Sequence, residues 1–218
     1  TDLKKVQMGL VKPPRIFGHE MAGTISQIGK NVKDWKLGDR VAVYHHIPCK
    51  DCYYCSVGAF AQCEVYKKVG TTAGFEPSGG GFAEYIRVMD WIVEKGMAKI
   101  PDQVSFEQAS FLEPVNTCLK AIRKSQVSKG HTVLIIGQGP IGLILLQLAR
   151  MEGAKVLTTD MLDFRINKSL EFGAEKAYNV SNGDVLNKIK TDTNNRGVDL
   201  AIVATANNQV IQFAMEAT

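Results

Sequence analysis

Short runs of alternating hydrophobic and polar residues fill the first part of the chain, up to about Met97. Glycine, aspartate and proline residues separate these runs. Alternation with a period of two, bounded by turn residues, is typical of half-buried β-strands. The pattern therefore predicts an all-β region with strands at Met21–Ile25, Val41–Tyr44 and Ala83–Val88.

From about Ser105 the pattern changes to helices that alternate with short apolar strands. The predicted helices are Phe106–Arg123, Ile141–Glu152, Phe164–Phe172 and Val185–Thr191. The predicted strands are Thr132–Ile136, Lys155–Asp160 and Val198–Ala204. Strands that alternate with helices, the first of them fully apolar, indicate a parallel sheet with crossover helices. The sequence thus predicts a β domain over residues 1–106 and a doubly wound α/β domain over residues 107–218, joined through a continuous helix.

The composition is that of an ordinary globular protein. The 218 residues are 45% hydrophobic and 22% charged, with a net charge of +4. Such a small charge excess gives no reason to expect nucleic acid or a membrane as a partner. The longest apolar stretch, Val133–Ala149, is shorter than the roughly 18–20 residues of a membrane span and is interrupted by glycines. No secretory signal is visible, and we expect a cytoplasmic protein.

Four of the five cysteines lie within fifteen residues, in the spacing C-x2-C-x2-C-x7-C. They are Cys49, Cys52, Cys55 and Cys63. Such dense clusters bind metal in proteins of reducing compartments. Four thiolates close a tetrahedral zinc site with no open position, which makes the zinc structural. An iron–sulfur cluster is the alternative use of four thiolates.

A glycine-rich turn joins a predicted strand to a predicted helix at Gly137–Gly142 and reads G-Q-G-P-I-G. In this context G-x-G-x-x-G is typical of dinucleotide binding, because the helix N-terminus accepts the pyrophosphate. Asp160 ends the next strand and would accept hydrogen bonds from the ribose of NAD. A turn that binds nothing is the alternative. The predicted cofactor-binding residues here are Gly137, Gly139, Pro140, Ile141, Gly142, Asp160 and Arg165.

Two further features carry possible metal ligands. His19 and Glu20 are adjacent nitrogen and oxygen donors before a predicted strand, although such a pair is more often structural. Glu113 is an acid in an apolar helical stretch, where it can be either a metal ligand or a helix-start acid that the dipole favours.

Together these motifs resemble the medium-chain, zinc-containing alcohol and polyol dehydrogenase family, of the sorbitol type. The stretch around Gly18-His19-Glu20, the cysteine cluster, Gly79–Tyr85 and the glycine turn with Asp160 follow the order of that family. The resemblance covers the whole chain. It implies a GroES-like catalytic domain, a Rossmann NAD-binding domain, and hydride transfer between a secondary alcohol or polyol and NAD at a catalytic zinc.

The resemblance also implies roles for single residues. Thr1 matches the hydroxyl that relays the substrate proton, in a start that resembles the end of C-G-T-D-L without its zinc-binding cysteine. His19, Glu20 and Glu113 match the catalytic zinc site, and Thr117 matches a position near the nicotinamide. The chain is accordingly expected to be an internal fragment with a weakly occupied catalytic zinc site and little activity, from a protein that forms homo-oligomers.

The sequence leaves other functions open. His46-Ile47-x-Cys49 resembles the threonine dehydrogenase branch, which is the alternative within the family. A non-catalytic, zinc-stabilised NAD-binding module is the second alternative. A zinc-bearing nucleic-acid binder would need a basic stripe with aromatic residues, and the sequence has none.

Overall fold

The structure, a computed structural model, describes residues 2–9, 15–65 and 79–218. Contacts divide the chain into two compact units, Thr1–Glu113 and Pro114–Thr218. The division falls inside α5 (Leu112–Lys124), a little beyond the boundary that the sequence predicts. None of the helices described is long and apolar enough to cross a membrane.

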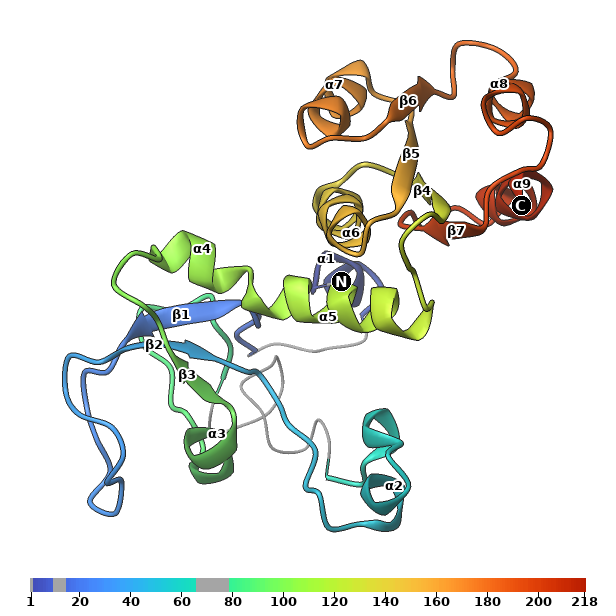
Figure 1. Ribbon diagram of the computed structural model, residues 1–218. Helices are drawn as coiled ribbons and strands as arrows, with labels where there is room; N and C mark the ends of the chain where they lie inside the picture. The colour runs from blue at the N-terminus through green and yellow to red at the C-terminus, as the bar shows by residue number, and fades with distance from the viewer. Residues whose placement is uncertain (1, 10–14, 66–78) are drawn as a thin grey trace. The chain divides into compact units, whose positions relative to one another are not determined.

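The first unit is built on a small antiparallel sheet with the strand order β1-β2-β3 (Figure 1). The strands are β1 (Met21–Thr24), β2 (Arg40–Val43) and β3 (Met97–Lys99). Val41 and Val43, two residues apart, face a core that Met21 and Ile92 complete. This is the alternation that the sequence showed, and the predicted strands at Met21–Ile25 and Val41–Tyr44 are confirmed with slightly different ends.

The first unit also contains helices, so the prediction of an all-β region is wrong. They are α1 (Asp2–Gln7), α2 (Tyr53–Ser56), the 3-10 helix η1 (Phe60–Gln62), α3 (Asp90–Lys95) and α4 (Phe106–Ser110). The predicted strand at Ala83–Val88 is wrong as well. Ile86 and Val88 do turn toward the core, but no described strand pairs with this backbone. The alternation here therefore reflects which side chains face the core, and the backbone does not pair with a described strand.

The helix predicted at Phe106–Arg123 is two helices, α4 and α5, separated at Phe111. Ser105 ends the preceding turn with a capping box, in which its side chain accepts from Gln108 N and Gln108 binds back to Ser105 N. Pro114 has no N–H to donate to the carbonyl of Ser110, four residues earlier. The missing hydrogen bond explains why the helix does not run straight through.

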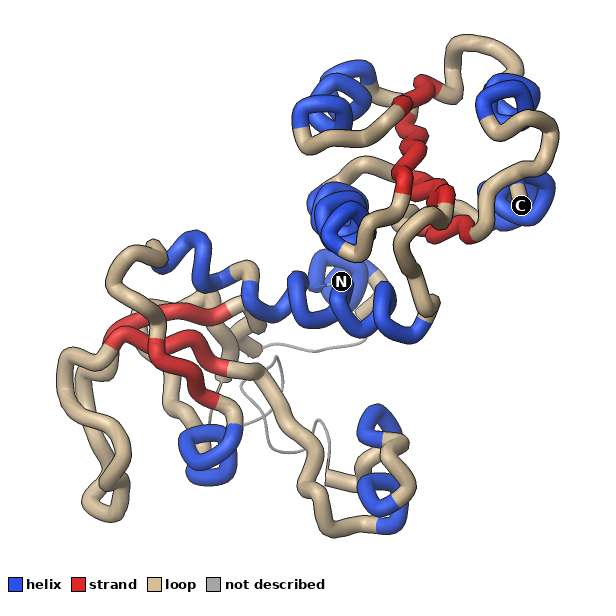
Figure 2. Tube along the Cα trace, in the orientation of Figure 1, coloured by secondary structure: helices blue, strands red, loops and turns tan. Residues whose placement is uncertain are grey.

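The second unit is a parallel sheet with helices on both faces, and the predicted doubly wound fold is confirmed (Figures 1 and 2). Its strand order is β6-β5-β4-β7. The strands are β4 (Thr132–Ile136), β5 (Lys155–Asp160), β6 (Lys176–Asn179) and β7 (Leu200–Val203). The helices are α6 (Pro140–Met151), α7 (Asp163–Glu171), α8 (Val185–Asp192) and α9 (Gln209–Ala217). The sequence did not predict β6, whose residues are mostly polar, or α9.

The core of the second unit has two layers, one on each face of the sheet. Val133 and Ile135 of β4 pack with α5 and α6, whereas Leu134 and Ile136 pack with α8 and α9. Burial on both faces is the physical reason why β4 is apolar at every position after Thr132. The same packing fixes the carboxyl ends of β4 and β5 side by side, because Ile136 pairs with Thr159.

Candidate metal and dinucleotide sites

The four clustered cysteines come together around α2 and η1. Cys49 precedes α2, Cys52 caps its start, Cys55 lies within it, and Cys63 follows η1. Their sulfur atoms all lie within 4.8 Å of one another. The Sγ of Cys49 is 3.9 Å from that of Cys55 and 3.5 Å from that of Cys63. Zn–S bonds of about 2.3 Å in a tetrahedron place sulfurs about 3.8 Å apart, so the four cysteines fit a zinc ion.

Backbone amides point at these sulfurs. The N–H groups of Asp51 and Cys52 donate to Cys49 Sγ at 3.5 and 3.4 Å, and Cys49 N donates to Cys63 Sγ at 3.3 Å. Backbone hydrogen bonds from Glu64 and Cys55 lower the pKa of the Cys52 thiol. Burial instead raises the pKa of the Cys55 thiol to about 12. A divalent cation at the centre would compensate that burial and favour the thiolate form of all four.

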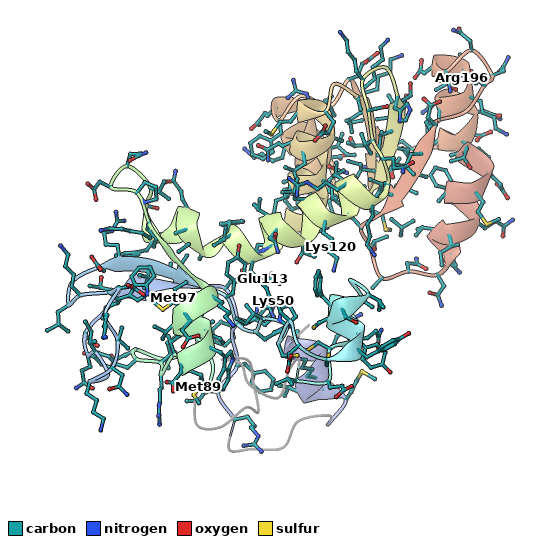
Figure 3. The ribbon with its side chains drawn as sticks, turned by 60° about the horizontal axis from the view of Figure 1, so that its bottom comes forward. Lys50, Met89, Met97, Glu113, Lys120 and Arg196 are labelled. Atoms are coloured by element: carbon teal, nitrogen blue, oxygen red, sulfur yellow. The ribbon has the colours of Figure 1, made fainter. Side chains whose placement is uncertain are left out.

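A second group of ligand atoms joins residues from the two ends of the first unit. His19 and Glu20 stand just before β1, and Glu113 lies in the first turn of α5 (Figure 3). Helix α4 packs against β1, so the helix that follows it begins beside the residues preceding β1. One ligand atom from each of the three side chains lies within 4.8 Å of the other two. One nitrogen and two carboxylate oxygens are donors that suit zinc.

The remaining residues of the predicted catalytic centre are placed as follows. Thr117 is one helical turn beyond Glu113 on α5, in the same direction from the helix axis. Thr1 lies outside the described residues. His45 packs edge-on against His19, with ring centroids 5.0 Å apart, and His46 packs against His45. The sequence showed the two histidines but gave no reason to place them beside His19, since only the fold brings β2 to that position.

The glycine turn has the geometry that the motif predicts. Gly137 has φ +96°, and its N–H donates to the carbonyl of Thr159 on β5. Gly139 caps the start of α6, with Pro140 and Ile141 as its first helical residues. A Cβ at Gly139 would have no heavy atom within 4 Å, whereas a Cβ at Gly142 would lie 1.9 Å from the carbonyl oxygen of Gly137. Open space at one glycine and close packing at the other fit a cradle for a pyrophosphate.

Asp160 lies at the carboxyl end of β5, beside this turn. Its Oδ2 accepts from Gln138 N at 2.7 Å, and its Oδ1 accepts from the N–H groups of Met161 and Leu162 at 2.8 and 3.0 Å. Arg165 Nη1 is 3.5 Å from Oδ2. The carboxylate is thus held in place from three sides, and the predicted residues Asp160 and Arg165 lie together.

Sequence reasoning missed Gln138, which joins this site through both its backbone and its side chain. Its only sequence signal is a polar residue within an apolar stretch, at a position where the motif accepts any residue.

Two family models match the chain. The model "Alcohol dehydrogenase GroES-like domain" matches residues 1–102, and the model "Zinc-binding dehydrogenase" matches residues 140–218. The first corresponds to the unit with the metal ligands and the second to the unit with the glycine turn. The predicted combination of a GroES-like domain and a Rossmann domain is confirmed.

The curated relatives include dehydrogenases of polyols and of threonine. Sorbitol dehydrogenase of Bacillus subtilis is 34% identical over 207 residues, which are 94% of this chain and 56% of that protein. L-threonine 3-dehydrogenase of Symbiobacterium thermophilum is 30% identical over 213 residues, covering 96% of this chain and 57% of that protein. The chain therefore spans less than two thirds of the length of these relatives.

Solved structures of similar fold contain both forms of the dinucleotide. A short chain alcohol dehydrogenase from Escherichia coli CFT073, complexed with NADH, has a TM-score of 0.82 and 30% identity, and the match covers 99% of this chain and 61% of that one. A zinc-binding dehydrogenase from Sinorhizobium meliloti 1021, bound to NADP, has a TM-score of 0.84 and 29% identity, over 95% of this chain and 59% of that one.

Proposed function

The chain belongs to the medium-chain, zinc-containing alcohol and polyol dehydrogenase family, and on this premise we propose that it forms the metal- and dinucleotide-binding part of an NAD-dependent polyol dehydrogenase. The observation that carries the proposal is the convergence of His19, Glu20 and Glu113. A non-catalytic NAD-binding module would need only the glycine turn. It would have no reason to bring a histidine and two acids together from distant parts of the sequence.

When bound, a zinc ion at these residues would polarise the substrate oxygen, and NAD would accept the hydride. The residues of the chain would bind the metal ion and orient the substrate and the dinucleotide. His19 and Glu113, both half-buried, offer one nitrogen and one carboxylate from positions partly shielded from water, where charge interactions are stronger than in bulk water. Glu20 is more exposed and offers the third donor.

The glycine turn and Asp160 would hold the dinucleotide. The free N–H groups at the start of α6 would meet the pyrophosphate, which the open space beside Gly139 admits. Asp160 would accept hydrogen bonds from the ribose hydroxyls and repel a 2′-phosphate. This charge supports NAD over NADP, although Arg165, 3.5 Å away, offsets part of it.

The cysteine cluster would hold a structural zinc, since four thiolates leave no open position. The sulfur separations near 3.8 Å support zinc, and an iron–sulfur cluster would need room between the sulfurs for several atoms. A cytoplasmic location belongs to the proposal as well. Its support is that four cysteines converge in a geometry that suits a metal ion, a use of clustered cysteines that is typical of reducing compartments. A homo-oligomer is expected from the family resemblance.

The substrate would be a polyol of the sorbitol type. The greater identity to sorbitol dehydrogenase supports this choice, and threonine is the second candidate because of the threonine dehydrogenase relative. Both substrates present neighbouring polar groups that two carboxylates and a metal ion can bind.

The test compares the natural gene product that carries this sequence with its Glu113→Gln and Glu107→Gln variants. NAD reduction is followed with sorbitol, xylitol and threonine, and zinc is measured by metal analysis. We expect Glu113→Gln to lower turnover by about a hundredfold or more and to lower the zinc content. Glu107→Gln, on the exposed side of α4, should change neither.

Four results decide between the alternatives. Turnover with polyols alone supports the proposal, and turnover with threonine alone assigns the chain to the second candidate. An enzyme whose turnover and zinc content survive Glu113→Gln would contradict the assignment of the metal site. A folded protein that binds NADH but contains only one zinc, and oxidises nothing, would be the non-catalytic module.

A further inference from the structure

Gln138 is a buried amide in the middle of the glycine turn. Its side chain is 1% exposed and lies among the largest fully buried side chains of the chain. It follows Gly137, the first residue after β4, and precedes Gly139, which caps α6. A glutamine at such a position is unusual, because burying an amide costs free energy unless its atoms find partners.

The side-chain nitrogen of Gln138 has two partners. Nε2 donates to the carbonyl of Ile135 at 3.0 Å and to the carbonyl of Gly137 at 3.1 Å. The reverse orientation of the amide would place Oε1 against two carbonyl oxygens, which all repel one another. Nε2 therefore links the end of β4, at Ile135, to Gly137, the first residue of the glycine turn.

The backbone of the same residue holds Asp160. Gln138 N donates to Asp160 Oδ2 at 2.7 Å, and this is the contact by which the turn and the end of β5 are joined at the carboxylate. The direction of that N–H depends on the peptide plane between Gly137 and Gln138. The carbonyl of Gly137 belongs to that same plane, so a side chain that binds the carbonyl also orients the amide.

The side-chain oxygen of Gln138 has no hydrogen-bond partner among the described residues. An unsatisfied buried acceptor lowers stability. An apolar side chain of equal length would avoid this cost and still fill the space. The amide is thus a poor choice for packing and a good choice for fixing the carbonyl of Gly137.

We propose that Gln138 is a positioning residue for the dinucleotide. Its side chain fixes the Gly137–Gln138 peptide plane. This plane sets the position of the glycine turn relative to the start of α6, and it also sets the orientation of the Asp160 carboxylate. The carbonyl oxygen of Gly137 is also the atom that leaves no room for a side chain at Gly142. This inference rests on the proposed dinucleotide site, and it assigns to one side chain the preorganisation of that site.

The test replaces the amide while keeping its volume. Gln138→Met removes both side-chain hydrogen bonds, and Gln147→Met is the matched control on the exposed face of α6. Affinities for NADH and NADPH are measured by fluorescence titration of the chain, and stability by thermal denaturation. We expect Gln138→Met to weaken NADH binding about tenfold, because the turn and Asp160 are no longer held in the binding geometry before the ligand arrives.

Two accompanying results distinguish positioning from packing. The Tm of Gln138→Met should stay close to that of the parent, because the loss of two hydrogen bonds is offset by the removal of the unsatisfied oxygen. NADPH binding should weaken less than NADH binding, since Asp160 would bind the 2′-hydroxyl that NADPH lacks. A structural role would instead lower Tm and leave the ratio of the two affinities unchanged, and that outcome would overturn the proposal.

A second variant covers the case in which methionine does not fold. In Gln138→Glu the protonated acid can donate to one of the two carbonyls, whereas the ionised acid is repelled by both and by Asp160. The NADH affinity of this variant, relative to that of the parent, should therefore decrease as the pH is raised from 6 to 8.5. A relative affinity that does not change with pH contradicts the proposal. A folded parent chain that binds no dinucleotide contradicts the proposed function itself.

Discussion

Gly139 and Gly142, three residues apart in the same turn, are glycines for different reasons. Gly139 has an ordinary φ of −71° and open space beside it, so neither its backbone nor its packing requires a glycine, and the proposed function assigns the space to the dinucleotide. Gly142 faces the carbonyl oxygen of Gly137, which a Cβ would approach to 1.9 Å, so its missing side chain serves the fold.

Alanine substitutions separate these two reasons. Gly139→Ala should change the free energy of unfolding by no more than about 0.5 kcal/mol and weaken NADH binding at least about tenfold. Gly142→Ala should lower the free energy of unfolding by about 1–3 kcal/mol, because a backbone atom must move to make room. Denaturant titration and NADH fluorescence measure the two effects.

Two outcomes would contradict this prediction. If Gly139→Ala binds NADH like the parent, the pyrophosphate does not lie against this turn. If Gly142→Ala is as stable as the parent, the close approach of α6 to the turn is not a feature of the protein in solution. Gly23, which also has open space beside it but lies in β1, offers the control substitution, since Gly23→Ala should leave NADH binding unchanged.

At the scale of elements, the short strand β6 depends on polar contacts with α8. Asp192, the last residue of α8, binds the ammonium group of Lys176 and accepts from Tyr178 Oη at 2.5 Å. These hydrogen bonds, that from Lys176 above all, hold the pKa of Asp192 below its usual value. Burial and the Asp192 carboxylate raise the pKa of Tyr178, so the phenol stays protonated.

This link predicts an acid-dependent part of the stability. Because the pKa of Asp192 is lowered in the folded state, its contribution is complete above the unfolded pKa of about 4 and is lost as the pH falls through the folded value. Asp192→Asn should therefore cost about 1 kcal/mol near pH 7, and its difference from the parent should shrink below about pH 4.

Thermal denaturation from pH 3 to pH 7 checks this, with Asp102→Asn as a control at an exposed acid of the first unit. A difference between parent and Asp192→Asn that stays constant over this range would show that the carboxylate charge does not stabilise β6.

The break between α4 and α5 determines where Glu113 lies. A single straight helix from Phe106 would carry Glu113 along a line fixed by α4. The break at Phe111, which Pro114 favours, lets α5 begin in a new direction and bring Glu113 to His19. The proline was visible in the sequence, but the direction of the helix after it was not.

At the scale of the whole molecule, the proposed metal sites and the proposed dinucleotide site lie in different units. All seven potential metal ligands belong to Thr1–Glu113, and the glycine turn and Asp160 belong to Pro114–Thr218. Each unit has its own core. Loss of metal should therefore unfold one unit locally and leave the other in place.

Metal removal tests this separation. Cys55→Ser, or a zinc chelator, should release one zinc per chain and expose the segment from Cys49 to Cys63 to protease, because the cluster supplies folding free energy to a lobe with few apolar contacts. NADH affinity should stay within about twofold of the parent's. Metal analysis, limited proteolysis and NADH titration measure these effects, and Ser56→Ala, at an exposed residue of the same lobe that is not a ligand, is the control.

A loss of NADH binding on chelation, at a temperature where the second unit remains folded, would contradict the independence of the two sites. A chain that carries iron instead of zinc would contradict the predicted metal.

The sequence by itself determined the patterns that depend on neighbours along the chain. Local sequence was enough to predict the cysteine cluster, the glycine turn and the strands β4 and β5. Each depends on residues that are close together along the chain, so residue type and periodicity identify it. Only the tertiary structure decided the rest. Whether Ala83–Val88 forms a ladder depends on a partner strand, and whether Glu113 meets His19 depends on the direction of α5. The role of Gln138 depends on where two carbonyl groups point, and no pattern of hydrophobic and polar residues encodes that.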